Sequence, residues 1–80
     1  MTIMHTVSGE AIDVLPAGTR IRSKRFPDLL GTIVKHEFHE SGAISPIPYY
    51  VGWDDEARAR LLLDGMFWYA DNDKVEEVLT

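Results

Sequence analysis

The sequence predicts a small, mainly β protein folded as one closed or nearly closed barrel. Three observations support this prediction. The chain has only 80 residues, short runs of β-branched and aromatic residues recur along it, and turn residues separate these runs. A chain of this length forms one domain with a small core. Closure removes the exposed edges that short strands would otherwise leave. We therefore expect a single domain with five or six short antiparallel strands.

The first strand of the barrel is expected shortly after residue 16, and the barrel itself over residues 16–79. Residues 1–15 contain scattered apolar side chains and are expected to form an N-terminal extension or an edge strand. Pro16-Ala17-Gly18 predicts a turn, because proline fixes φ and glycine permits a positive φ. Thr19 to Ser23 then alternates, which predicts a half-buried strand.

The middle and the end of the chain contain three further strand patterns. Residues 29–38 are rich in β-branched and aromatic side chains and predict a long strand. Residues 39–48 contain two prolines and predict an irregular link, long enough to be a functional loop. Residues 49–53 predict the next strand. A turn at 71–74 and a short closing strand at 75–79 complete the barrel.

The segment between these last strands supports two interpretations. Asp64-Gly65 lies between two apolar runs, a strong hairpin signal, and favours strand–turn–strand. The alternative is one short helix over residues 56–63, in which Asp54 or Asp55 is the N-cap and Gly65 follows the last turn. We favour the hairpin and keep the helix as the alternative.

Four segments occur in a recognisable order: Ala17-Gly18-Thr19-Arg20-Ile21-Arg22, Gly31-Thr32-Ile33-Val34, Tyr49-Tyr50-Val51-Gly52-Trp53-Asp54-Asp55 and Val75-Glu76-Glu77-Val78. Together they resemble an SH3-like small β-barrel domain of the broad KOW/Tudor type, over about residues 17–79. The link at 39–48 is longer than is usual in such barrels, and Glu56 stands where they have a turn glycine. The resemblance implies a binding module, in which exposed aromatic side chains form a cage for methylated lysine or arginine, or stack on bases.

Composition excludes several classes of site chemistry. The chain has no cysteine, so disulfides, thiolate nucleophiles and cysteine-based metal sites are excluded. It contains neither a G-x-S-x-G motif nor a glycine-rich phosphate loop. His36 and His39 are three residues apart, which does not match the spacing of a helical zinc motif, and we expect both to be exposed polar residues. We therefore expect no catalytic activity, no metal and no cofactor.

The chain is expected to be an acidic cytoplasmic protein, because it has no cysteine and its start shows no export signal. Eight Lys and Arg residues oppose 13 Asp and Glu residues, a net charge of −5. Residues 1–36 hold five cations and three acids, whereas residues 37–80 hold three cations and ten acids. No apolar run approaches the roughly 20 residues of a membrane span, and the start lacks the pattern of a signal peptide. We expect no membrane partner.

Two surfaces are candidates for binding. Tyr50 and Trp68 are the aromatic residues expected to be exposed, and His39 and Ile44 belong to the neighbouring link, so these four residues form the candidate protein-binding surface. The other surface is a basic strand face, because residues that alternate along a strand share one side. Its residues are Arg20, Arg22 and Lys24, with Arg25 and Lys35 near them.

The expected function is that of a protein-interaction accessory or adaptor that docks on a larger partner. The alternative is a nucleic-acid-associated module that uses the basic strand face and an exposed aromatic residue. A net charge of −5 disfavours the alternative, because proteins that bind nucleic acid are usually basic. Self-association through an exposed strand edge is left open.

Overall fold

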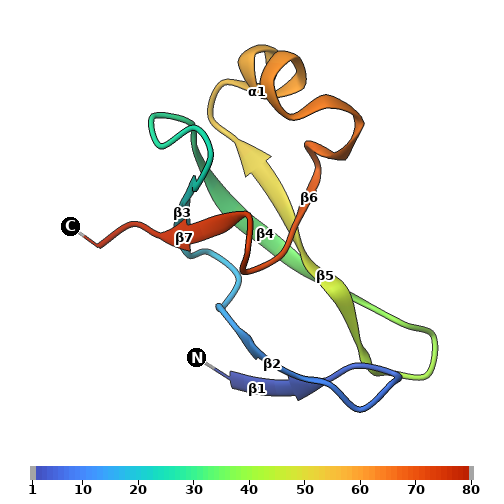
Figure 1. The fold of residues 1–80 in the computed structure, drawn as a ribbon. Helices are drawn as coiled ribbons and strands as arrows, with labels where there is room; N and C mark the ends of the chain where they lie inside the picture. Colours follow the sequence, from blue (N-terminus) through green and yellow to red (C-terminus); the bar gives the residue numbers. More distant parts are fainter. Residues whose placement is uncertain (1, 80) are drawn as a thin grey trace.

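Two antiparallel sheets and one short helix form the structure, a computed structural model that describes residues 2–79 without the side chain of Met66 (Figure 1). The first sheet is a hairpin of β1 (Thr2–His5) and β2 (Ala11–Val14). The second has the order β6-β5-β4-β3-β7. Its strands are β3 (Arg20–Ser23), β4 (Leu30–Phe38), β5 (Ile44–Trp53), β6 (Tyr69–Ala70) and β7 (Val75–Glu77). Between β5 and β6 lie helix α1 (Glu56–Leu63) and the 3₁₀ turn η1 (Asp64–Met66).

The predicted fold class is confirmed: the protein is mainly β, and its five-stranded sheet is curled. This curled sheet is compatible with an SH3-like barrel. Within the described residues, β6 and β7 lie at the two ends of the sheet order and do not pair with each other. The long strand β5 runs from the N-terminal hairpin at one end of the molecule to α1 at the other (Figure 1). Across the described residues, no helix has the length and apolar character needed to cross a membrane.

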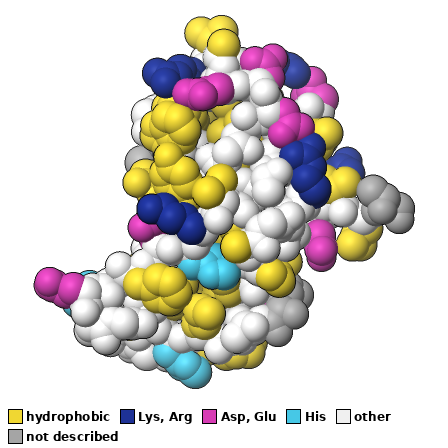
Figure 2. Space-filling model, turned by 180° about the vertical axis from the view of Figure 1, so that it is seen from behind, with side chains coloured by type: hydrophobic (Ala, Val, Ile, Leu, Met, Phe, Trp, Pro, Cys, Tyr) yellow, Lys and Arg dark blue, Asp and Glu magenta, His cyan; other side chains and the backbone are white. Residues whose placement is uncertain are grey.

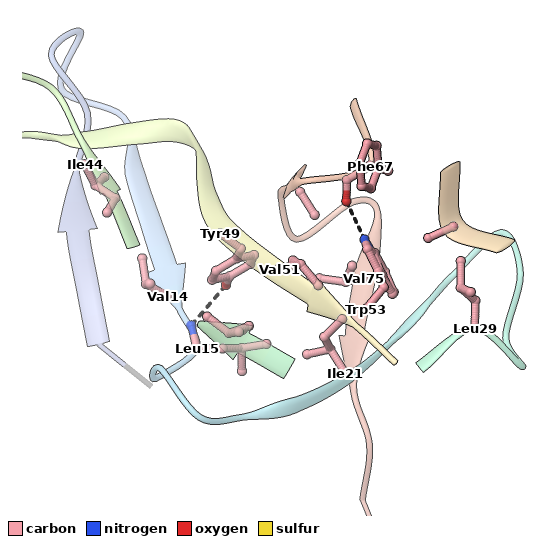
Figure 3. Close-up of a cluster of buried hydrophobic side chains, with 13 residues drawn as sticks. Val14, Leu15, Ile21, Leu29, Ile44, Tyr49, Val51, Trp53, Phe67 and Val75 are labelled. Carbon is pink, nitrogen blue, oxygen red and sulfur yellow. Dashed lines mark hydrogen bonds between the residues drawn. The ribbon is translucent and has the colours of Figure 1, made fainter. Parts of the chain in front are cut away.

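The core lies on the inner face of the curled sheet (Figure 3). Tyr49, Val51 and Trp53 share this face and are buried, as their alternation predicts. Ile21 and Ile33 face them from β3 and β4, and both are fully buried. This apolar layer fixes which side chains of β4 and β5 point outward, and these outward positions form the surface.

The N-terminal segment forms a hairpin of its own and does not add an edge strand to the main sheet. Its turn is closed by Thr6, whose Oγ1 accepts from the Glu10 N–H at 3.1 Å, and by Gly9 at φ 88°. Val14, the last residue of β2, and Leu15, which follows it, are both part of the common core. The hairpin is therefore fastened to the main sheet through its last residues.

The prediction of a long irregular link at 39–48 is wrong. Strand β5 begins at Ile44, so only residues 39–43 connect it to β4. Proline suggested an irregular segment, since it cannot donate to a ladder. However, Phe38 pairs with Ile44 and His36 with Tyr49, and no pair lies between them. The two prolines occupy this unpaired stretch of β5, where they interrupt no ladder.

The prediction of a hairpin over residues 56–69 is wrong. The alternative prediction, a short helix over residues 56–63, is confirmed as α1. The Asp55 carboxylate is the N-cap and accepts from the Arg58 N–H at 3.1 Å. The Ala59 side chain is fully buried against the core. At the end of α1 the positive φ of 56° falls on Asp64 and not on Gly65. Capping and burial together outweigh the local Asp-Gly signal.

The cap gives a first prediction. Asp55→Ala should lower the free energy of unfolding by about 1 kcal/mol, because one N–H at the helix start loses its acceptor. Denaturant unfolding measures this loss. Asp55→Ser keeps an oxygen in the capping position and should lose distinctly less. Equal losses in the two variants would show that the cap does not stabilise α1.

Candidate functional site

A stack of four side chains crosses the outer face of the molecule, and we call it the column: Lys35, Tyr50, Trp68 and Arg60. The Tyr50 and Trp68 rings are stacked, with centroids 5.8 Å apart and planes within 5°. Lys35 Nζ lies over the Tyr50 ring at 5.2 Å from its centroid. Arg60 Cζ lies 5.8 Å from the Trp68 centroid and 4.9 Å from that of Phe67. Two rings thus lie between two cations.

The members of the column come from four different segments: β4, β5, α1 and the turn between η1 and β6. A bulge in β4 follows Ile33, so Val34 is inserted and Lys35, not Val34, lies opposite Tyr50. Tyr50 also has Tyr69 opposite it on β6, and the two rings meet edge to face at 5.5 Å. Since β4 and β6 flank β5 on opposite sides, Lys35 and the Trp68 segment approach Tyr50 from opposite directions.

The column differs from the aromatic cage that the resemblance implies. A cage needs ring faces open to a ligand cation. Here Lys35 and Arg60 of the chain itself lie over the Tyr50 and Trp68 rings. Figure 2 shows a face on which hydrophobic side chains lie between Lys or Arg side chains above and below them, with Asp or Glu side chains beside these cations. The surface therefore presents positive charge beside apolar area.

An apolar groove of about 690 Å³ lies next to the column, between the turn of the N-terminal hairpin and the hairpin end of β4 and β5. We call it the groove. Four exposed hydrophobic side chains line it: Val7 (64% exposed), Phe38 (54%), Tyr69 (40%) and Ile47 (36%). Among the described residues that line it, Glu37 is the one acidic or basic side chain apart from His39. Tyr69 also contacts Tyr50 and so joins the groove to the column.

The candidate protein-binding residues fall on both features. Tyr50 and Trp68 are half-buried members of the column. His39 lines the groove and is exposed, and its Nδ1 accepts from the Ser41 N–H at 3.1 Å. Ile44 also borders the groove, but it is 1% exposed, so its side chain offers the groove almost no surface.

His36 is half-buried rather than exposed as expected. Its Nε2 donates to the Leu15 carbonyl at 2.7 Å, and its ring lies 6.2 Å from that of Tyr49. The side chain thus joins β4 to the segment after β2. His36 and His39 thus each form a hydrogen bond within the fold, so both imidazoles have a structural role.

The basic strand face is partly neutralised. Arg20 forms two hydrogen bonds with the Asp54 carboxylate, at 2.9 and 2.6 Å, and a third with Thr32 Oγ1 at 2.8 Å. The guanidinium holds the pKa of Asp54 below its usual range. Arg22 lies opposite Glu76 of β7 in the ladder. An acid therefore lies beside each of these two arginines.

The remaining basic candidates lie elsewhere. Lys35 belongs to the column. Lys24 and Arg25, together with Lys74, line a separate cleft of about 530 Å³ on the other side of Tyr69 and Ile47. Three acids line the same cleft, so its charge is mixed: Asp64, Asp71 and Asp73. The five residues predicted as one basic surface are therefore divided among separate places.

No family model, curated protein or solved structure matches the chain.

Several residues of these features were not among the predicted candidates. Phe38 and Val7 contribute the most exposed hydrophobic surface of the groove. Two register shifts separate Phe38 from the buried Ile33, so alternation along β4 could not have placed its side chain. Arg60 lies in the segment expected as a strand, and its position over Trp68 follows only from α1.

Proposed function

We propose that this protein is a non-catalytic binding module, an SH3-like barrel of the KOW/Tudor type, that docks on a larger protein as an accessory or adaptor. The groove carries the proposal. Four of its side chains are large, hydrophobic and at least 36% exposed, and they surround one concave surface of about 690 Å³.

Concentrated apolar exposure of this kind is typical of interaction sites, because single exposed hydrophobic side chains are normally scattered. A concave surface also gives a partner side chain a place to be desolvated, which is where binding energy concentrates. The groove is formed by two hairpins that the core holds in place through Val14 and Ile44. It is thus formed before a partner arrives.

The experiment compares two substitutions of the same kind, each of which replaces an exposed apolar side chain by serine. Phe38→Ser removes an exposed ring from the groove, whereas Leu61→Ser removes an exposed apolar side chain of α1 that does not line the groove. Immobilised wild-type and variant proteins are exposed to a lysate of the source cells, and retained proteins are identified by mass spectrometry. We expect a partner on the wild type and on Leu61→Ser that Phe38→Ser retains at least tenfold less, because a central anchor contributes about 2 kcal/mol.

Folding is checked by thermal unfolding of both variants, since an exposed position should tolerate serine. If the same proteins are retained equally by wild type, Phe38→Ser and Leu61→Ser, the groove is not a docking surface and the proposal fails.

A further inference from the structure

We infer that the column binds an acidic segment of a protein partner, with side-chain carboxylates of the segment near Lys35 and Arg60. The inference deepens the proposed function, because Tyr69 joins the column to the groove and one partner segment can cover both. Such a segment combines an apolar anchor with neighbouring Asp or Glu residues.

The two cations are available to a ligand. No ion pair within 4.0 Å joins Lys35 to an acid of the described part of the chain. Arg60 Nη2 pairs with Glu56 Oε1 at 2.9 Å. A guanidinium has five N–H donors, so this one contact leaves others for a second carboxylate. Packing over Tyr50 and Trp68 also restricts the two side chains, which lowers the entropy that a bound carboxylate must remove.

The arrangement selects against a cationic ligand. Methylated lysine binds by placing its charge over an aromatic face. Here the Tyr50 and Trp68 rings stack on each other, Lys35 lies over the Tyr50 ring, and Arg60 lies over the Trp68 ring. A ligand cation would have to displace one of the chain's own cations and would meet the other.

Nucleic acid fits the column less well than a short acidic segment does. A polyphosphate carries a charge at every nucleotide and extends beyond two cations. The net charge of the chain is −5, which opposes an extended polyanion. Two carboxylates on a short peptide match the two cations without that extended repulsion.

The test measures binding of a synthetic peptide in which two glutamates flank a phenylalanine. Nitrogen–proton NMR spectra follow the indole N–H of Trp68 and the amide of Tyr50 at low salt. We expect the peptide to shift both signals. We expect its matched glutamine peptide to bind several-fold more weakly, and salt to weaken binding of the glutamate peptide.

Variants assign the effect to the column. The double variant Lys35→Gln with Arg60→Gln should bind the glutamate peptide roughly tenfold more weakly, because each of two exposed ion pairs contributes a few-fold to the affinity. Lys24→Gln removes a cation that lines the separate cleft and should leave affinity unchanged. Thermal unfolding confirms that the variants fold.

Three results would overturn the inference: equal binding of the glutamine peptide, an undiminished affinity in the double variant, or tighter binding of a trimethyl-lysine peptide or a single-stranded oligonucleotide. None of them bears on the groove, because Phe38→Ser tests the groove independently. Conversely, if Phe38→Ser retains the same proteins from the lysate as the wild type, docking in the groove is refuted. That result would leave the peptide affinity measured at the column unchanged.

Discussion

Tyr49→Phe is expected to lower the free energy of unfolding by about 1–3 kcal/mol, although it removes a single oxygen atom. Tyr49 is fully buried. Its hydroxyl accepts from the Leu15 N–H at 3.0 Å and donates to Asn72 Oδ1 at 2.5 Å. Asn72 Nδ2 in turn donates to the Asp13 carbonyl at 2.8 Å. Without the hydroxyl, the buried Leu15 N–H loses its acceptor and the Asn72 side chain loses its donor, so the link of β5 to both segments is broken.

Chemical denaturation measures the loss, and Tyr69→Phe is the matched control. Tyr69 is 40% exposed, so loss of its hydroxyl should change the free energy of unfolding by less than about 0.5 kcal/mol. Equal stability of wild type and Tyr49→Phe would mean that the Leu15–Tyr49–Asn72 network does not hold the N-terminal hairpin to the sheet.

The same hydroxyl should make stability depend on alkaline pH. Burial raises the pKa of Tyr49 above its ordinary value, and the nearby Asp13 and Asp71 carboxylates raise it further. Above the ordinary pKa of tyrosine, near 10, the unfolded chain releases this proton while the folded chain keeps it. Stability therefore falls as pH rises beyond that value. The fall should be steeper for wild type than for Tyr49→Phe, and parallel curves would contradict this role of burial.

Gly31→Ala is the other substitution with a large expected effect, a loss of about 1–3 kcal/mol from overpacking. A Cβ at this position would lie 3.0 Å from the Gly52 carbonyl oxygen, 3.0 Å from Trp53 Cε3 and 3.1 Å from Val51 Cγ1. The oxygen belongs to the paired strand β5, and the Trp53 and Val51 side chains are buried, so none of the three yields without moving the ladder.

Gly65→Ala provides the comparison. A Cβ there would have no neighbour within 4 Å, and Gly65 does not adopt a positive φ. Alanine should leave stability unchanged or raise it by a few tenths of a kcal/mol, because it restricts the unfolded chain. Thermal unfolding of the two variants ranks them. If Gly31→Ala were as stable as Gly65→Ala, the close contact of β4 and β5 at Trp53 would be contradicted.

Alternation predicted those strands whose two faces differ in polarity. Tyr49, Val51 and Trp53 face the core because β5 has a buried side and an exposed side. Local signals failed where a tertiary contact decided the outcome. Asp64-Gly65 predicted a hairpin, but the buried Ala59 and the Asp55 cap stabilise a helix.

The candidate site was predictable only in part, because its parts are far apart in the sequence. Tyr50 and Trp68 were identified from their positions in alternating segments. Their cations were not, since Lys35 reaches Tyr50 through a β-bulge and Arg60 reaches Trp68 from α1. The groove is lined by residues of the turn between β1 and β2 and of the turn between β4 and β5. No local sequence pattern shows that these two turns lie side by side.

Photo-crosslinking from the groove tests most directly whether a protein partner docks there. The photo-reactive p-benzoylphenylalanine replaces Phe38 in one protein and Leu61 in another, and both are irradiated in the source-cell lysate. Both positions are exposed, so reagent access is comparable. We predict a discrete crosslinked partner from position 38 that is absent from position 61. The same crosslinked products from both positions, or none from position 38, would contradict docking in the groove.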